Sequence, residues 1–209
     1  MSSTPQTMQQ KFIALLPLLV ITVVCFIALF IVNDLTKDKI ENNKQRAALA
    51  VIKDVLPLEY DNDLFNDKIE LAVPTWINNT GKLNVYRARL GEQPVAISLM
   101  PITTKGYGGT ITLTIGIRYD GTVMGIKILQ HNETEGFGDK VHQDKSDWLQ
   151  NFNNASISTT PEKQWATKKD DGAFDQLSGA TITSRSIINI IYKTLTYYSE
   201  NKDDFYETH

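Results

Sequence analysis

The longest feature of the hydrophobic pattern is an uncharged run of 21 residues from Phe12 to Val32. A helix rises about 1.5 Å per residue, so this run matches the roughly 30 Å hydrocarbon core of a bilayer. A secretory signal peptide is the competing interpretation, but its apolar region would be shorter, and no cleavage site of small residues follows Val32. We therefore expect a short tail over residues 1–11 and an uncleaved transmembrane helix over residues 12–32.

The segment that follows has the composition of a helix from Asp34 to Leu56. An apolar stripe at helical spacing lies near its end, formed by Leu49, Ile52, Val55 and Leu56. Pro57 cannot continue the helix, and a polar stretch follows it. We expect a helical linker over residues 33–60 and a soluble domain over residues 61–209.

Alternation with a period of two predicts strands in the first half of this domain. Residues 110–117 alternate strictly, Asp120-Gly121 is a typical hairpin turn, and residues 123–129 read as the returning strand. A second hairpin is expected between Leu83 and Met100, and a short helix from Asp144 to Phe152. The soluble part is therefore predicted to be one α+β domain with an antiparallel sheet and helices.

The last helix is predicted from about Ser184 to Asn201, with Thr183 or Ser184 as its N-cap. Its buried face consists of Ile187, Ile188, Ile190, Ile191, Leu195 and Tyr198. The helix is preceded by Ser178-Gly179-Ala180-Thr181-Ile182-Thr183. A helix start binds anions, and the small residues Gly179 and Ala180 would let a phosphate approach the Thr181 hydroxyl. The alternative is an ordinary turn that leads into a capped helix.

A second candidate element is the loop from His131 to Lys140, which follows the predicted strand. Gly136 and Gly138 would let the backbone fold around a ligand, and hydrogen-bonding groups for a polar ring are offered by His131, Glu133 and Thr134. Tyr107, in another glycine-rich stretch, could stack on a flat heterocycle. The alternatives are a solvated loop and, less favoured, a metal site that also uses Asp139.

The composition of the chain argues against several kinds of partner and cofactor. The net charge is −3 and basic residues are not clustered with aromatic ones, which argues against a nucleic-acid partner. The single cysteine, Cys25, lies inside the apolar run. An intramolecular disulfide, cysteine-ligated zinc and an iron–sulfur cluster held by this chain alone are therefore excluded, so redox chemistry would need an organic cofactor.

Several motifs occur together in a known order. They are the N-terminal anchor, Gly106-Tyr107-Gly108-Gly109, His131-x-Glu133-Thr134-x-Gly136-x-Gly138-Asp139-Lys140, Trp165-Ala166 and Asp175-x-x-Ser178-Gly179-Ala180-Thr181-x-Thr183. In this combination the chain resembles the G subunit of the Rnf-type (Rsx) electron transport complex, over nearly its whole length.

The resemblance implies one FMN per chain, attached through its phosphate to the hydroxyl of Thr181 by a flavin transferase that uses FAD and Mg²⁺. Asp175 and Ser178 would help the transferase recognise or shape the motif, which continues through Gly179 and Ala180 to Thr183. The loop from His131 to Gly138 would pack against the flavin. The subunit would relay electrons and have no catalytic site and no metal of its own.

The resemblance also implies a location. The complex couples electron transfer between ferredoxin and NAD to ion movement across the bacterial inner membrane, and this single-pass subunit would face the periplasm beside the other subunits. Positive charge alone points weakly the other way, because basic residues are more numerous after the anchor than before it.

Three other functions stay open, and one of them is a stand-alone periplasmic reductase domain. The C subunit of the sodium-translocating NADH:quinone reductase has the same motif and anchor, although its members tend to be longer. A membrane-anchored binding module without flavin would use the glycine-rich loops to contact a protein partner.

Overall fold

A computed structural model describes residues 8–207. Its helices and strands are α1 (Met8–Val55), β1 (Lys68–Ala72), β2 (Lys82–Leu90), β3 (Gln93–Leu99), β4 (Ile102–Gly106), β5 (Gly109–Arg118), β6 (Val123–Gln130) and α2 (Thr181–Glu200). Short 3₁₀ helices are η1 (Gly138–Val141), η2 (Trp148–Phe152), η3 (Glu162–Gln164), η4 (Lys168–Asp170) and η5 (Lys202–Phe205). The chain divides into two compact units, residues 1–48 and Leu49–His209.

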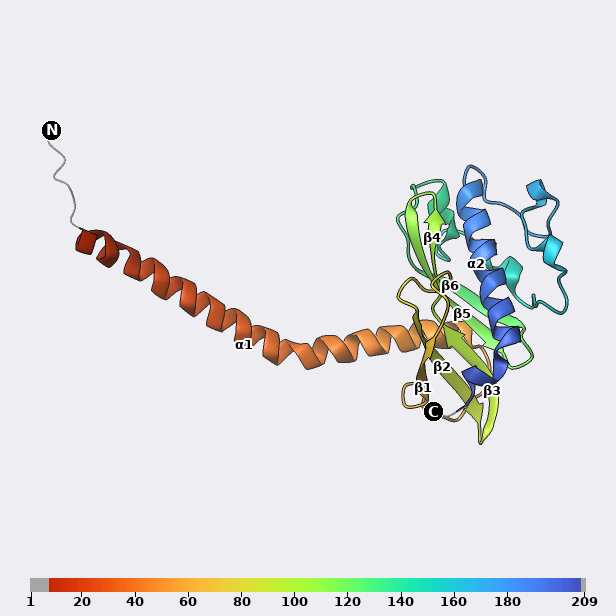
Figure 1. Ribbon diagram of the computed structural model, residues 1–209, viewed down its shortest axis with the longest axis horizontal. Coiled ribbons are helices and arrows are strands. Elements are labelled where there is room, and N and C mark those ends of the chain that lie inside the picture. Colours follow the sequence, from red (N-terminus) through yellow and green to blue (C-terminus); the bar gives the residue numbers. More distant parts are fainter. Residues whose placement is uncertain (1–7, 208–209) are drawn as a thin grey trace. The chain divides into compact units, whose positions relative to one another are not determined.

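The first unit contains most of α1, which is continuous from Met8 to Val55 (Figure 1). Its stretch Leu19–Lys37 is long and apolar enough to cross a membrane, judged by length and composition alone. Residues 1–7 of the expected tail lie outside the described residues. The expected anchor and the expected linker as far as Val55 thus belong to one helix, and residues 56–60 lie beyond its end.

The second unit is built on an antiparallel sheet with the strand order β1-β2-β3-β5-β4, and β6 also pairs with β5. β3 and β4 follow one another along the same edge of β5, since Ile115 pairs with Leu99 and Thr112 pairs with Ile102. β6 pairs along the other edge of β5. Both expected hairpins are present, and β1 and β4 are additional strands.

α2 covers one face of the sheet. The buried face of α2 packs against the strands in one large core. Core residues of β5 are Ile111, Leu113, Ile115 and Ile117, and those of α2 include Ile187, Ile188, Ile190, Ile191, Leu195 and Tyr198. This packing confirms the apolar face that the sequence predicted for the last helix.

The end of α1 covers the other face. Ile52, Val55 and Leu56 form a second buried cluster with Tyr86, Ala88 and Ala96 of β2 and β3. The backbone of Val55 lies so close to Gly116 of β5 that an added Cβ there would be 1.9 Å from the Val55 carbonyl oxygen. Both faces of the sheet are therefore buried, and the α+β prediction is confirmed.

One helix prediction is wrong, both in the type of helix and in its length. The short helix predicted for residues 144–152 is only the 3₁₀ helix η2, Trp148–Phe152. Residues before it are held in turns, because Ser146 Oγ donates to the Lys140 carbonyl at 2.5 Å and accepts from the Trp148 N–H at 3.3 Å. Hydrogen bonds of this local kind compete with helix formation.

Candidate functional site

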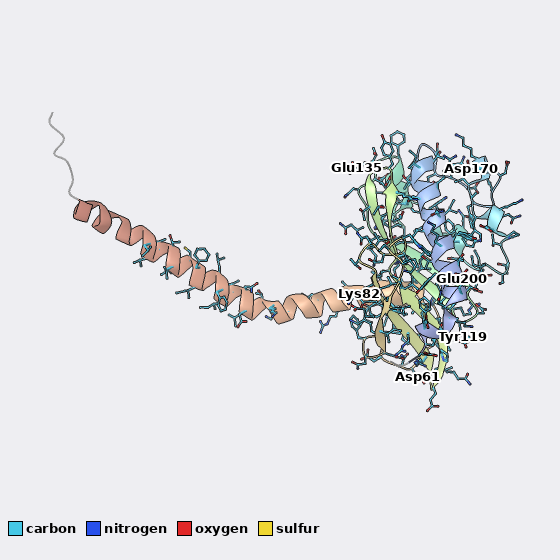
Figure 2. The ribbon with its side chains drawn as sticks, in the orientation of Figure 1. Asp61, Lys82, Tyr119, Glu135, Asp170 and Glu200 are labelled. Atoms are coloured by element: carbon cyan, nitrogen blue, oxygen red, sulfur yellow. The ribbon has the colours of Figure 1, made fainter. Side chains whose placement is uncertain are left out.

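Three segments far apart in the sequence form one cavity of about 480 Å³. They are the turn between β4 and β5, the loop that follows β6, and the first turn of α2. The lining residues are Tyr107, Glu133, Thr134, Phe137, Gly138, Gly179, Ala180, Thr181, Ile182 and Thr183. Figure 2 places the labelled Glu135 and Asp170 at the end of the domain where α2 begins, and Glu200 at the other end of that helix.

The start of α2 differs from the prediction. The helix begins at Thr181, its N-cap is Ala180, and no side chain caps it. The expected cap residues are used otherwise: Ser184 Oγ accepts from the Leu177 N–H and donates to the Ala180 carbonyl, both at 3.0 Å, and Thr183 donates to Glu133. The first N–H groups of α2 are thus left without side-chain partners beside the cavity.

The hydroxyl groups of the motif have different surroundings. Thr181 lines the cavity and is partly exposed, whereas Thr183 lines it but is fully buried. Ser178 is exposed and does not line the cavity. Before Thr181 the chain turns at Gly179, whose φ of +78° is a backbone conformation that favours glycine.

The loop after β6 is held in part by a hydrogen bond of its own. His131 Nδ1 accepts from the Glu133 N–H at 3.1 Å, so His131 orients the loop and does not line the cavity. Glu133 is buried in the cavity wall, and Gly138 lies beside it. Gly136 and Asp175 also lie outside the lining. Asp175 Oδ2 pairs with Lys168 Nζ at 2.8 Å, and its carbonyl accepts from Trp148 Nε1 at 2.6 Å.

Two lining residues were not predicted as site residues. Phe137 and Ile182 are 55% and 52% exposed, and with Tyr107 at 70% they give the cavity an apolar rim from all three segments. A signal was present in the sequence, because Phe137 lies between two glycines and Ile182 is out of phase with the buried face of α2.

Charged groups near the site are mostly paired. Burial alone would raise the pKa of the Asp139 carboxyl. This effect is outweighed by a hydrogen bond from the Gly136 N–H, by the neighbouring Lys145 and by the electrostatic interaction with His131, so the pKa lies below its ordinary value. Behind the start of α2, Arg185 holds Asp170 through two hydrogen bonds of 2.7 and 2.5 Å. Among the described residues, no three His, Cys, Asp or Glu side chains are grouped as a metal site requires.

Comparison with known proteins identifies the family. The chain is 36% identical to the G subunit of the ion-translocating oxidoreductase complex of Pseudoalteromonas atlantica over 169 residues, which covers 80% of this chain and 79% of that one. It is 38% identical to the corresponding G subunit of Stutzerimonas stutzeri over 172 residues, 82% of this chain and 73% of that one. The chain belongs to the family of G subunits of ion-translocating oxidoreductase complexes. The expected family is therefore confirmed.

This family membership agrees with a match to the FMN-binding domain over residues 106–196. All residues that line the cavity fall inside this matched segment. The fold is similar to the crystal structure of Shewanella oneidensis NqrC, with a TM-score of 0.52 at 15% identity, over 78% of this chain and 97% of that one. The cavity is thus part of an FMN-binding domain.

Proposed function

We propose that this subunit carries one FMN bound covalently through a phosphoester to Thr181, and that it relays electrons within a membrane-bound, ion-translocating complex. The observation that carries the proposal is the position of the Thr181 hydroxyl. It belongs to the first residue of α2, which lines the cavity and is partly exposed. Thr183 is buried and Ser178 lies outside the cavity, so neither hydroxyl competes with that of Thr181 as the attachment point for the phosphate.

The cavity fits a flavin nucleotide in size and chemistry. Its volume of about 480 Å³ lies within the range of small-molecule sites, about 300–1,000 Å³. The uncapped start of α2 offers backbone N–H groups and a positive dipole end to a phosphate. The rim of Tyr107, Phe137 and Ile182 offers apolar surface to a flat ring.

FMN supplies one- and two-electron chemistry when it is bound, and the protein supplies position and electrostatics. Thr181 would hold the phosphate, and the rim would shield part of the ring from water. A covalent link keeps the cofactor from being lost in the periplasm. Thr181 would be the acceptor of a maturation reaction and would take no part in turnover.

Partners and location follow from the same proposal. A periplasmic flavin transferase that uses Mg²⁺ would transfer FMN from FAD to the Thr181 hydroxyl, breaking the pyrophosphate bond of FAD and releasing AMP. Ser178 and Asp175 are exposed outside the cavity and would be available for recognition. The apolar stretch of α1 would anchor the chain in the bacterial inner membrane, with Leu49–His209 in the periplasm beside the other subunits.

The alternative is the C subunit of the sodium-translocating NADH:quinone reductase, because NqrC has a similar fold. The sequence relatives, however, are G subunits and support the first candidate. The two candidates have the same cofactor and differ in their partner subunits. Purification of the native membrane complex and mass spectrometry of its subunits would separate them.

The attachment is tested by the intact mass and the in-gel flavin fluorescence of denatured protein produced together with the transferase. We expect one FMN on the wild type and on Thr181→Ser, and none on Thr181→Ala. Thr134→Ala is the matched control, because Thr134 is the other threonine of the cavity wall that is not buried, and it should keep the FMN. Covalent flavin on Thr181→Ala would contradict the assignment, and a dark wild-type band would favour a binding module.

A further inference from the structure

Glu133 joins the three segments that form the cavity. It follows β6 in the chain, and the residue is only 7% exposed. Oε1 accepts a hydrogen bond from the Gly108 N–H at 3.0 Å, in the turn between β4 and β5. Oε2 accepts one from the Thr183 hydroxyl at 2.5 Å, in the first turn of α2. A single carboxylate thus holds the loop after β6 to both other walls.

The backbone around this carboxylate is packed too closely for other residues. A Cβ added at Gly138 would lie 2.7 Å from Glu133 Oε2 and 2.9 Å from Glu133 Cβ, below the distance that real Cβ contacts show. The absence of a side chain at Gly138 therefore lets the loop close over the carboxylate. This packing fixes where Glu133 lies in the wall.

The charge of Glu133 has no cationic partner. Both oxygens accept hydrogen bonds, and both donors are neutral. None of the ion pairs among the described residues includes Glu133. A charge that is poorly solvated and unpaired acts on neighbouring charge more strongly than it would in water.

We propose that Glu133 is the positioning residue of this cavity, which joins its three walls and, through its negative charge, lowers the reduction potential of the group bound there. The electrostatic part rests on the proposed function. Each electron that enters without a proton adds negative charge to the cavity, and a fixed carboxylate in the wall makes that addition less favourable. The potential should therefore rise when the charge is removed and the shape is kept.

The positioning part is tested on the full chain produced without the transferase, by amide hydrogen exchange. Glu133→Ala removes both acceptors, so the Gly108 amide should lose its protection. Glu133→Gln keeps a carbonyl acceptor and should keep most of it. Glu135→Gln is the matched control, since Glu135 is exposed on the same loop and should leave exchange unchanged. Wild-type protection of Gly108 in Glu133→Ala would overturn the proposal.

The electrostatic part is tested on the flavin-bearing chain by spectroscopic redox titration. Glu133→Gln should shift the midpoint potential to a more positive value, and Glu135→Gln should stay close to the wild type. A merely structural role for Glu133 would not produce this difference. Equal potentials for Glu133→Gln and the wild type would overturn the proposal.

Two further outcomes are decisive. A folded Glu133→Gln chain with a protected Gly108 amide but no flavin would also overturn the proposal, because the charge would then act on attachment. Absence of flavin from the wild type would instead refute the proposed function and, with it, the electrostatic part. The exchange experiment would still decide the positioning part, so the two failures are distinguishable.

Discussion

The contact between Gly116 and the end of α1 makes a sharp stability prediction. In Gly116→Ala, the new Cβ would lie 1.9 Å from the Val55 carbonyl oxygen and 2.8 Å from the Val55 carbonyl carbon, well inside the 3.4 Å of ordinary contact. The obstacle is backbone, which cannot turn aside as a flexible side chain can. Either the end of α1 lifts from the sheet or the strand moves away from it.

The cost can be worked out from what the end of α1 buries. Overpacking in a core costs about 1–3 kcal/mol. If the contact opens instead, Val55 and Leu56, which are 1% and 2% exposed, lose part of a burial that is worth about 1.5–3 kcal/mol for each side chain. We expect Gly116→Ala to lower the free energy of unfolding by about 2–5 kcal/mol. For a unit of this size the fall in Tm would be roughly 5–20 °C.

Gly125→Ala is the matched control. Gly125 pairs with Gly116 across β5 and β6. A Cβ added at Gly125 would be 3.2 Å from Val55 Cα, so Val55 would have to move by only a few tenths of an ångström. Its Tm should stay within a few degrees of the wild type, because alanine also gains about 0.5–1 kcal/mol over glycine inside a strand. Thermal unfolding followed by near-ultraviolet circular dichroism measures both variants. Equal losses in the two variants would refute the reasoning.

Three further predictions concern charged and phenolic groups. Hydrogen bonds from Arg185 and Thr167 lower the pKa of Asp170 to about 2, below the ordinary 3.8, so its contribution to stability is complete above pH 3.8 and is lost as the pH falls through about 2. Acid unfolding should therefore begin at a higher pH in Arg185→Gln; an unchanged acid profile would contradict this. Asp67→Asn should cost about 3 kcal/mol in urea unfolding, because it leaves the Arg87 guanidinium, 5% exposed, without its main counter-charge; a midpoint equal to that of the wild type would count against this role. Burial raises the pKa of Tyr198 to about 12, so the phenolate absorbance of Tyr198→Phe should follow the wild type until the pH approaches 12, and an earlier divergence would argue against the burial effect.

The sequence predicted those parts of the fold that depend on local pattern. Residues 110–129 form the expected hairpin, because strict alternation and the Asp120-Gly121 turn act over a few residues. The sequence predicts a start of α2 that is too late, since Ser184 and Thr183 have the chemistry of N-caps but bond to Leu177 and Glu133 instead. Such tertiary partners leave no mark in a single sequence. β4 was missed because its short run of threonines shows little apolar alternation.

In the candidate site, too, local sequence predicts some features and tertiary contacts determine the others. The sequence predicts cofactor contacts where a polar or aromatic side chain lies beside glycines. Three residues predicted in this way line the cavity: Thr181, Glu133 and Tyr107. His131 was expected as a cofactor contact, yet its Nδ1 is used by the loop itself. Which member of a polar loop faces the cavity depends on how the loop closes. That closure is set by Gly108 and Thr183, which lie far from the loop in sequence.

The burial of Ile52 and Val55 in the second core cluster has a practical consequence for preparing a water-soluble fragment. The boundary between linker and domain that the sequence predicts, near residue 61, would remove two turns of helix that complete one face of the sheet. A truncation that begins just before Leu49 keeps them and discards the stretch Leu19–Lys37. Crystallisation and spectroscopy without detergent should therefore use a fragment that begins between residues 38 and 48, and a shorter fragment would expose the apolar side chains of β2 and β3 to aggregation.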